Sequence, residues 1–315
     1  MDYHIKTALV FGAGGFIGHN LVRRLKREGW YVVGVDLKKP QWEVSNADEF
    51  HTADARTFKI DTYRYFDRIY QLAADMGGAG FVFTKENDAD ILSNSLAINL
   101  NVLSQLVSRD GKRSVKCGTI FFSSSACAYP DGVSGKEEDA YPANPPYDYR
   151  REKIISERMY QAYARNYGVD VRIARFQNTF GENGTFRGGR EKSPAAICRK
   201  VAEATESIDV CGDGRQVRPF IYIYDLLDGI EALMQSDYQE PINLGTDDSI
   251  TITELAEMII DISGKNLKIN YISGPTGEMR RNCDTARMKE VLKWEPTRPL
   301  RESFEKTYKW IEKYL

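Results

Sequence analysis

The sequence predicts an α/β fold in which a doubly wound parallel sheet is followed by a smaller, mixed α/β lobe. Short apolar runs alternate with segments that show the period of amphipathic helices, as in parallel strands joined by crossover helices. A glycine-rich turn, Gly12 to Gly18, separates the first strand from the first helix. After Phe176 the pattern changes to a polar loop, Gly181–Arg190, and then to mixed strands and helices.

Each element follows from a local pattern. The expected strands are short apolar runs bounded by turn residues: Ala8–Phe11, Tyr31–Val35, Arg68–Ala73, Gly118–Phe122 and Val169–Phe176. The expected helices are longer segments with helical spacing of their apolar residues: Phe16–Glu28, Asp88–Val107, Tyr149–Asn166 and Thr253–Ile262. Gly29 closes the first helix, because glycine readily adopts the left-handed conformation at a helix end.

Composition narrows the class of protein. The 315 residues suffice for one large core or a core and a smaller lobe. A hydrophobic content of 42% and a charged content of 28% exclude disordered and fibrous classes. With a net charge of −2 and no basic block, nothing favours binding to nucleic acid or to an anionic membrane. The five cysteines and three histidines have no paired or metal-ligand spacing. No apolar run approaches membrane-spanning length, so we expect a reduced, cytoplasmic protein without a metal site.

The glycine turn predicts a dinucleotide site. Gly12 permits a tight turn, Gly15 lets the backbone approach a pyrophosphate, and Gly18 lets the helix pack against the strand. The helix N-terminus offers free N–H groups and a favourable dipole to the anion. Asp36, at the end of the second strand, can accept hydrogen bonds from both ribose hydroxyls and would repel a 2′-phosphate. The sequence therefore predicts NAD as the cofactor.

The turn also fixes the expected organisation of the chain. Residues 1–178 are predicted to form a Rossmann-like NAD-binding domain. Residues 219–246, including Phe220–Met234, are expected to return to that domain. Residues 179–218 and 247–315 are expected to form a substrate-binding lobe.

Tyr149 and Lys153 predict hydride transfer at a carbinol. They stand four residues apart near the start of an expected helix, so both side chains share one face. A free tyrosine has a pKa of about 10 and is a poor base near neutral pH. A neighbouring ammonium and a positive nicotinamide ring would stabilise the phenolate, so we expect the pKa of Tyr149 to be lowered. Ser125, at the end of a strand, is placed to hydrogen-bond the same substrate hydroxyl.

These residues resemble the extended short-chain dehydrogenase/reductase family, in its nucleotide-sugar epimerase and dehydratase group. Further matches to that group are Gln71-Leu-Ala-Ala74, Gly212-Asp-Gly214 with Arg218, Asn243-Leu-Gly245 and Trp294-Glu-Pro296. Three more segments resemble the GDP-mannose 3,5-epimerases: Ala74-Asp-Met-Gly-Gly-Ala-Gly-Phe81, Ser124-Ser-Ala-Cys127, and Gly188-Gly-Arg-Glu-Lys-Ser-Pro-Ala-Ala196 followed by Cys198-Arg-Lys200. The resemblance covers nearly the whole chain. It departs from the family after Tyr149, where Arg150-Arg151-Glu152 replaces a small, neutral start.

The resemblance implies a set of site residues. The cofactor-binding residues would be Gly12, Gly15, Phe16, Ile17, Gly18, Asp36, Asp54, Ala55, Leu72, Ala73, Ala74, Tyr149 and Lys153. A nucleotide-diphosphate sugar, a GDP-hexose, would be bound by Gly78, Ser125, Asn178, Glu191, Lys192, Lys200, Gln216, Arg218 and Arg281. The catalytic residues would be Tyr149, Lys153, Ser125, Cys127 and Lys192. A homodimer is implied, paired through the Asp88–Val107 and Tyr149–Asn166 helices.

The resemblance also implies a mechanism. Tyr149 would take the proton of the sugar 4-hydroxyl while NAD takes the C4 hydride. The resulting ketone acidifies C3–H and C5–H, because either carbanion is delocalised as an enolate. Cys127 and Lys192 match the acid/base pair that inverts these carbons, and return of the hydride to C4 leaves no net oxidation.

Three alternatives are distinguishable. A 4,6-dehydratase needs an acidic pair just after Ser125, and Ala126-Cys127 supplies none. A simple 4-epimerase needs only Tyr149 and NAD, so Cys127 would be a packing residue and Lys192 a solvated lysine or a phosphate clamp. A non-catalytic dinucleotide sensor would keep the glycines and Asp36 but has no reason to keep Tyr149, Lys153 and Ser125.

Overall fold

The computed structural model describes residues 4–61, 64–82, 85–107, 117–130, 132–133, 135–141, 147–274 and 279–315. Its central feature is a seven-stranded sheet in the order β10-β6-β5-β4-β1-β2-β3, in which every pair of neighbours is parallel. The strands are β1 (Thr7–Phe11), β2 (Tyr31–Asp36), β3 (Glu49–Thr52), β4 (Phe66–Gln71), β5 (Cys117–Ser125), β6 (Asp170–Phe176) and β10 (Ile242–Leu244). The predicted doubly wound parallel sheet is confirmed.

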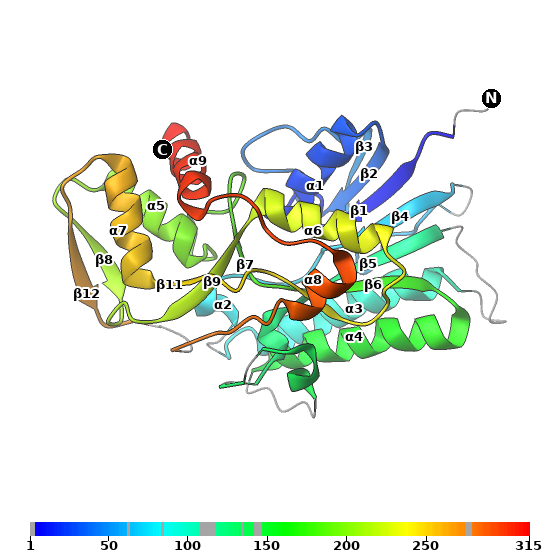
Figure 1. Ribbon diagram of the computed structural model, residues 1–315. Coiled ribbons are helices and arrows are strands. Elements are labelled where there is room, and N and C mark those ends of the chain that lie inside the picture. The colour runs from blue at the N-terminus through cyan, green and yellow to red at the C-terminus, as the bar shows by residue number, and fades with distance from the viewer. Residues whose placement is uncertain are drawn as a thin grey trace.

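Helices cover both faces of this sheet (Figure 1). One face carries α1 (Phe16–Arg27) and α6 (Ile223–Gln235), and the other carries α3 (Asp88–Gln105) and α4 (Asp148–Tyr167). Alternate residues of β1 show why the strands are apolar throughout. Ala8 and Val10 pack in a cluster with residues of α1 and α6, whereas Leu9 and Phe11 pack in a second cluster with residues of α3 and α4. A strand buried on both faces has no polar side to present.

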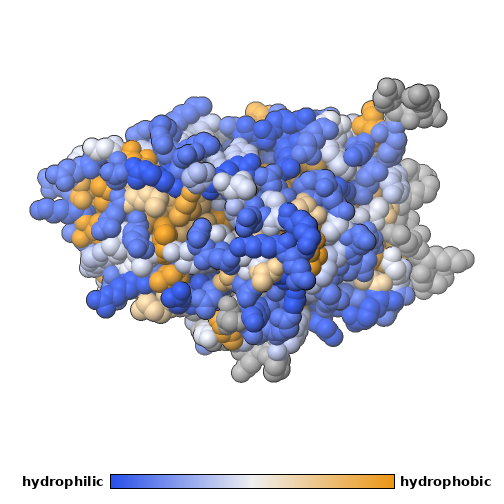
Figure 2. Space-filling view, viewed as in Figure 1, coloured by the Kyte–Doolittle hydropathy of each residue, from blue (hydrophilic) through white to orange (hydrophobic). Residues whose placement is uncertain are grey.

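A smaller lobe lies beside the large sheet, on the left in Figure 1. It contains a three-stranded sheet, β11-β9-β7, and a two-stranded sheet, β12-β8. The strands are β7 (Asn178–Phe180), β8 (Ser207–Cys211), β9 (Val217–Tyr222), β11 (Ser249–Thr251) and β12 (Lys268–Ile272); the remaining α-helices are α2 (Ala79–Val82), α5 (Ser193–Glu203), α7 (Ile252–Ser263), α8 (Ala286–Leu292) and α9 (Leu300–Lys313). In the view of Figure 2, hydrophilic residues cover most of the visible surface of the molecule, and small apolar groups lie chiefly on the smaller lobe.

The segment that returns to the large sheet is shorter than the sequence indicates. Only β10 pairs with it, alongside β6, and α6 packs over β6. The stretch Phe220–Met234 was expected in that sheet, but its strand β9 pairs with β7 and β11 instead. Periodicity identifies a strand but not its partner, because the pairing depends on distant residues. The limits of the two lobes stay a prediction.

Parallel pairing brings the ends of the strands to one edge. Phe11 stands opposite Val35 on β2 and Gln71 on β4, and Gln71 stands opposite Phe122 on β5. The residues that follow these positions therefore share the carboxyl edge of the sheet, where α/β folds bind ligands.

A buried ion pair holds α4 against the neighbouring strands. Arg175 on β6 and Glu157 on α4 are at most 1% exposed and form two hydrogen bonds, at 2.8 and 2.7 Å. Ser124 on β5 donates its hydroxyl to the same carboxylate at 2.5 Å. Because a buried charge is costly without partners, this contact sets the position of α4 relative to the end of β5.

Candidate active site

The glycine turn is closed by backbone contacts that leave no room for side chains. Gly12 has φ +81°, and a Cβ on it would lie 2.9 Å from the backbone nitrogen of Ala73. A Cβ on Gly18 would lie 2.0 Å from the carbonyl oxygen of Gly12. Gly15 is less crowded, with 3.3 Å to the same oxygen. Helix α1 therefore begins directly against the turn, as the motif predicts.

Asp36 fastens this turn to the end of β2. Its carboxylate accepts the backbone N–H of Gly14 at 2.9 Å and that of Lys38 at 3.1 Å. Each oxygen keeps a lone pair for a further donor. The glycine cradle, the helix N-terminus and this carboxylate fit a dinucleotide with free ribose hydroxyls.

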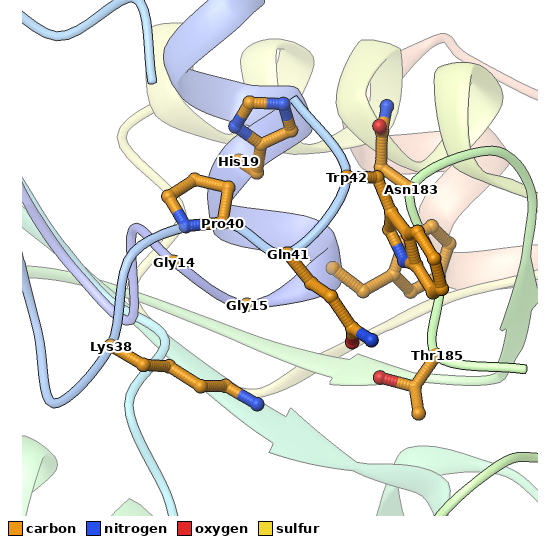
Figure 3. Close-up of a pocket in the computed structure, with 10 residues that line it drawn as sticks. Gly14, Gly15, His19, Lys38, Pro40, Gln41, Trp42, Asn183 and Thr185 are labelled. Atoms are coloured by element: carbon orange, nitrogen blue, oxygen red, sulfur yellow. The ribbon is translucent and has the colours of Figure 1, made fainter. Parts of the chain in front are cut away.

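The other expected cofactor residues lie at the same edge. Leu72, Ala73 and Ala74 directly follow β4, and the Leu72 N–H donates to the Phe11 carbonyl at 3.1 Å. Asp54 and Ala55 follow β3, where the Asp54 carboxylate is paired with Arg56 at 2.6 Å. A cavity beside the turn, drawn in Figure 3, is lined by Gly14, Gly15, Phe16, His19, Lys38, Pro40, Gln41, Trp42, Asn183 and Thr185.

Tyr149 and Lys153 lie on one face of α4, as predicted. The Lys153 ammonium is 5.6 Å from the centre of the Tyr149 ring and 3.5 Å from the Ser123 carbonyl oxygen. It also lies 3.3 Å from the carboxylate of Glu152, which is fully buried. The negative charge of Glu152 therefore weakens the stabilisation that the Lys153 ammonium gives to a Tyr149 phenolate.

In the chain without its cofactor, the surroundings of Tyr149 act against the expected lowering of its pKa. That expectation includes the charge of a bound nicotinamide ring and stays a prediction. Burial raises the pKa of Tyr149 well above its ordinary value, and the charges of Cys127 and Glu152 add to the effect. Ser125 and Arg281 act in the opposite direction but do not reverse it. Residue spacing alone did not show that the Glu152 carboxylate and the Cys127 thiol act on Tyr149.

Cys127 lies on a short turn at the end of β5, formed by Ala126–Ala128. The Ser125 hydroxyl accepts the Cys127 N–H at 3.1 Å, and the Arg281 guanidinium Nη1 lies 3.3 Å from the thiol sulfur. Burial alone would raise the pKa of the Cys127 thiol, but Arg281, Ser125, Arg150 and Lys192 together lower it below its ordinary value. Cys127 and Tyr149 also belong to one buried cluster.

Lys192 directly precedes α5. The residue as a whole is exposed to solvent, although protein atoms surround its amine. The protein around it lowers the pKa of Lys192 by desolvation, with Arg281 acting in the same direction and Cys127 in the opposite one. The loop is held by Gly78, whose N–H donates to the Arg190 carbonyl at 3.1 Å. A Cβ on Gly78 would lie 2.5 Å from the Glu191 carbonyl oxygen, so this approach requires glycine.

The remaining expected substrate residues are less uniformly placed. Burial and the charge of Arg281 lower the pKa of Arg218 to about 10, so Arg218 lies near the same group of charges and is still a cation at neutral pH. Asn178 donates to the Pro219 carbonyl at 3.2 Å. Lys200 donates to the Asp209 carbonyl at 2.6 Å, and Gln216 to the Asp213 carboxylate at 3.2 Å. The roles of these residues with a substrate stay predictions.

Two residues at the site were not identified as functional from the sequence. Glu152 pairs with Lys153, and Arg150 is buried close enough to influence Cys127. The available signal was the run of charged residues, Arg150-Arg151-Glu152, directly after Tyr149.

Within the residues that the structure describes, no group of three or more His, Cys, Asp or Glu side chains is arranged to hold a metal ion. No helix in the described ranges is long and apolar enough to cross a membrane.

Comparisons with known proteins identify the family of the chain. The chain is 39% identical to GDP-mannose 3,5-epimerase of Arabidopsis thaliana, over 97% of this chain and 82% of that protein. It is 30% identical to UDP-glucuronic acid decarboxylase 1 of Xenopus tropicalis, over 98% and 73% respectively. The structure of UDP-glucose 4-epimerase of Thermotoga maritima with UDP-glucose matches with a TM-score of 0.84 at 25% identity, over 98% of this chain and 99% of the other. Residues 8–245 match the family described as NAD dependent epimerase/dehydratase. The chain belongs to this NAD-dependent epimerase/dehydratase family, and the family predicted from its sequence is confirmed.

Proposed function

We propose that this enzyme is a nucleotide-sugar 3,5-epimerase that acts on a GDP-hexose, the activity named for its relative in Arabidopsis thaliana. The observation that carries the proposal is the Cys127 thiol, with the Arg281 guanidinium 3.3 Å from its sulfur. A lowered thiol pKa increases the fraction of thiolate, which is the form that can act as a base. A simple 4-epimerase has no step that uses such a base.

The first step is oxidation at C4. Bound NAD supplies the chemistry of a reversible hydride acceptor. Tyr149 takes the proton of the 4-hydroxyl, and Ser125 orients that hydroxyl. In the chain without its cofactor, burial raises the pKa of Tyr149. The positive charge of a bound nicotinamide ring, together with the Lys153 ammonium, would lower that pKa and make the phenolate available as the base.

The second step is inversion next to the ketone. Cys127 and Lys192 act as the base and acid at C3 and C5. Their charges favour one another: Lys192 lowers the pKa of the thiol, and Cys127 raises the pKa of the amine. Ammonium and thiolate together form a proton donor and a proton acceptor, which inversion requires on opposite faces of the ring.

Arg281 and Arg218 are proposed to bind the diphosphate. Arginine suits phosphate oxygens because its planar fork can donate two parallel hydrogen bonds. Arg218 already donates to the Val217 carbonyl at 2.8 Å, which limits its orientations. Arg281 would also have a second role, because its guanidinium contacts the thiol of Cys127.

Solvent deuterium incorporation tests the function. The NAD-loaded enzyme is incubated in D₂O with GDP-mannose, and the recovered sugar is analysed by NMR. Deuterium at C3 or C5 supports the proposal. Inversion at C4 without exchange would indicate a 4-epimerase, and binding without either change a non-catalytic sensor. UDP-glucose serves as the matched control for the nucleotide and the hexose.

A 3,5-epimerase regenerates its cofactor in every cycle. We therefore expect NAD to stay bound through purification and turnover to need no added oxidant. Absorbance of reduced nicotinamide should not accumulate in proportion to product. Stoichiometric accumulation would instead identify a net dehydrogenase and contradict the proposal.

We also propose a cytoplasmic homodimer paired through α3 and α4. The two helices pack side by side, and each exposes a large apolar residue, Leu100 at 53% and Ile155 at 47%. Sedimentation at micromolar concentration should give a dimer, and Ile155→Glu should dissociate it. A wild-type monomer would reject the pairing, and cell fractionation tests the compartment.

A further inference from the structure

Arg150 carries a positive charge into the protein interior directly after Tyr149. Its side chain is only 1% exposed. A buried arginine lowers stability unless its charge and its N–H groups have partners. Its Nη1 donates to the Tyr129 carbonyl at 3.1 Å, and its guanidinium lies 5.3 Å from the centre of the Tyr147 ring.

The partner carbonyl places this charge at the end of the turn that carries Cys127. Tyr129 is the residue that ends the Ala126–Ala128 turn, in which Cys127 is the middle residue. Arg150 is also among the cations that lower the pKa of the Cys127 thiol. The hydrogen bond thus attaches the guanidinium to the same short turn as the thiol.

A bound substrate is expected to change the contacts of Arg281 but not those of Arg150. Under the proposed function, Arg281 binds the diphosphate, so the substrate competes with the thiolate for its guanidinium. Arg150 is enclosed by protein and hydrogen-bonded to a backbone carbonyl. Its charge therefore stays beside the turn whether or not a substrate is present.

We propose that Arg150 is a positioning residue that favours the thiolate form of Cys127 through a fixed positive charge beside the turn. The proposal deepens the proposed function, since it concerns the residue taken there as the ring base. Its test needs no sugar and no turnover. If removing the Arg150 charge shifts the pH profile of Cys127 alkylation in an enzyme that shows no C3/C5 exchange, this inference stands and the proposed function is rejected.

The test is the pH dependence of alkylation of Cys127 by iodoacetamide, followed by peptide mass spectrometry in the NAD-loaded chain. The thiolate is the reactive form, so the rate reports its fraction. Arg150→Gln keeps a donor for the Tyr129 carbonyl but removes the charge, and alkylation at neutral pH should fall at least about threefold. Arg150→Lys keeps both charge and donor, so its profile should stay close to wild type.

A neighbouring arginine provides the control. Arg151 is paired with Asp148 at 2.6 Å, and its side chain is 50% exposed. Arg151→Gln removes the same charge one residue away, where solvent screens it, and should leave the profile unchanged. NAD content and thermal unfolding verify that each variant is folded. If Arg150→Gln does not fold, Arg150→Met takes its place, because it keeps the length of the buried side chain.

Two results would overturn the proposal. If Arg150→Gln and Arg150→Lys both alkylate like wild type, the charge does not act on the thiol. If both slow equally, Arg150 only supports the turn and its charge is irrelevant.

Discussion

The cofactor turn and the reaction centre lie on the same edge of the sheet but are held together by different forces. In the turn, backbone atoms approach so closely that a Cβ on Gly18 would lie 2.0 Å from the Gly12 carbonyl oxygen. In the reaction centre, charged side chains from separate segments converge on Cys127, among them Arg281 and Lys192. The first region depends on the absence of side chains, and the second depends on a balance of charges.

The difference determines how each region responds to substitution. Adding one methyl group to the turn displaces backbone atoms that form the cofactor site. Removing one charge from the reaction centre changes little in shape but alters several pKa values, because the groups titrate together. Variants of the two regions should therefore fail in different assays.

The largest effect is expected for Tyr149→Phe, which removes the proton acceptor for C4 oxidation. Both cofactor reduction and C3/C5 exchange should fall by about two orders of magnitude or more. Stopped-flow absorbance and deuterium exchange by NMR measure the two steps. NAD content should be unchanged, because the ring remains. Exchange at the wild-type rate would show that another group is the base.

Cys127→Ala should separate the two steps. C3/C5 exchange should collapse while C4 oxidation persists, because oxidation needs no thiol. The Cys127 charge raises the pKa of Tyr149, so its removal should lower that pKa. A base with a lower pKa is deprotonated at lower pH, and the acidic limb of C4 oxidation should shift in that direction. Cys211→Ala, at a cysteine outside this group, is the control. Retained exchange would make Cys127 a packing residue.

The same contrast explains what the sequence could predict. The tight turn at Gly12 and Gly18 and the place of Asp36 at this edge could be predicted because steric rules act over a few neighbouring residues; their roles with the cofactor stay predictions. The face shared by Tyr149 and Lys153 followed from helical spacing alone.

Such local rules could not predict how the charged side chains of the reaction centre are arranged. The Glu152 carboxylate beside Lys153 and the buried guanidinium of Arg150 depend on how α4 packs against the rest of the molecule. For this reason the surroundings that raise the pKa of Tyr149 in the chain without its cofactor could not be predicted. The partner of β9 was missed for a similar reason, because strand pairing is a long-range choice.

Two alanine substitutions test the steric half of the comparison. Gly18→Ala should destabilise the fold by about 1–3 kcal/mol in urea unfolding, because backbone atoms must move. Gly15→Ala should lower stability less than Gly18→Ala, since its Cβ would lie 3.3 Å from the nearest atom, a tight contact that a small shift relieves, and its φ of −84° suits any residue. It should nevertheless lose NAD, because the methyl group would face the pyrophosphate. Equal stability losses would contradict this distinction.

The smallest effect concerns a titrating group within the cofactor region. His19 is 2% exposed and lines the cavity in Figure 3 together with Gly14 and Lys38. Burial lowers its pKa below 6.5, and the charge of Arg23 adds to this, whereas Glu43, 3.9 Å from the ring, opposes it.

Below about pH 6.5 the unfolded chain therefore binds a proton that the folded chain resists, so stability should fall as the pH drops through this range. His19→Gln removes the titrating ring. Its urea midpoint should change less than that of wild type between neutral and mildly acidic pH. His51→Gln, at a side chain that is 45% exposed, should behave like wild type. Identical pH dependence in His19→Gln and wild type would mean that the buried ring accepts its proton as readily as in the unfolded chain. The charge sensitivity of this edge would then be confined to the reaction centre.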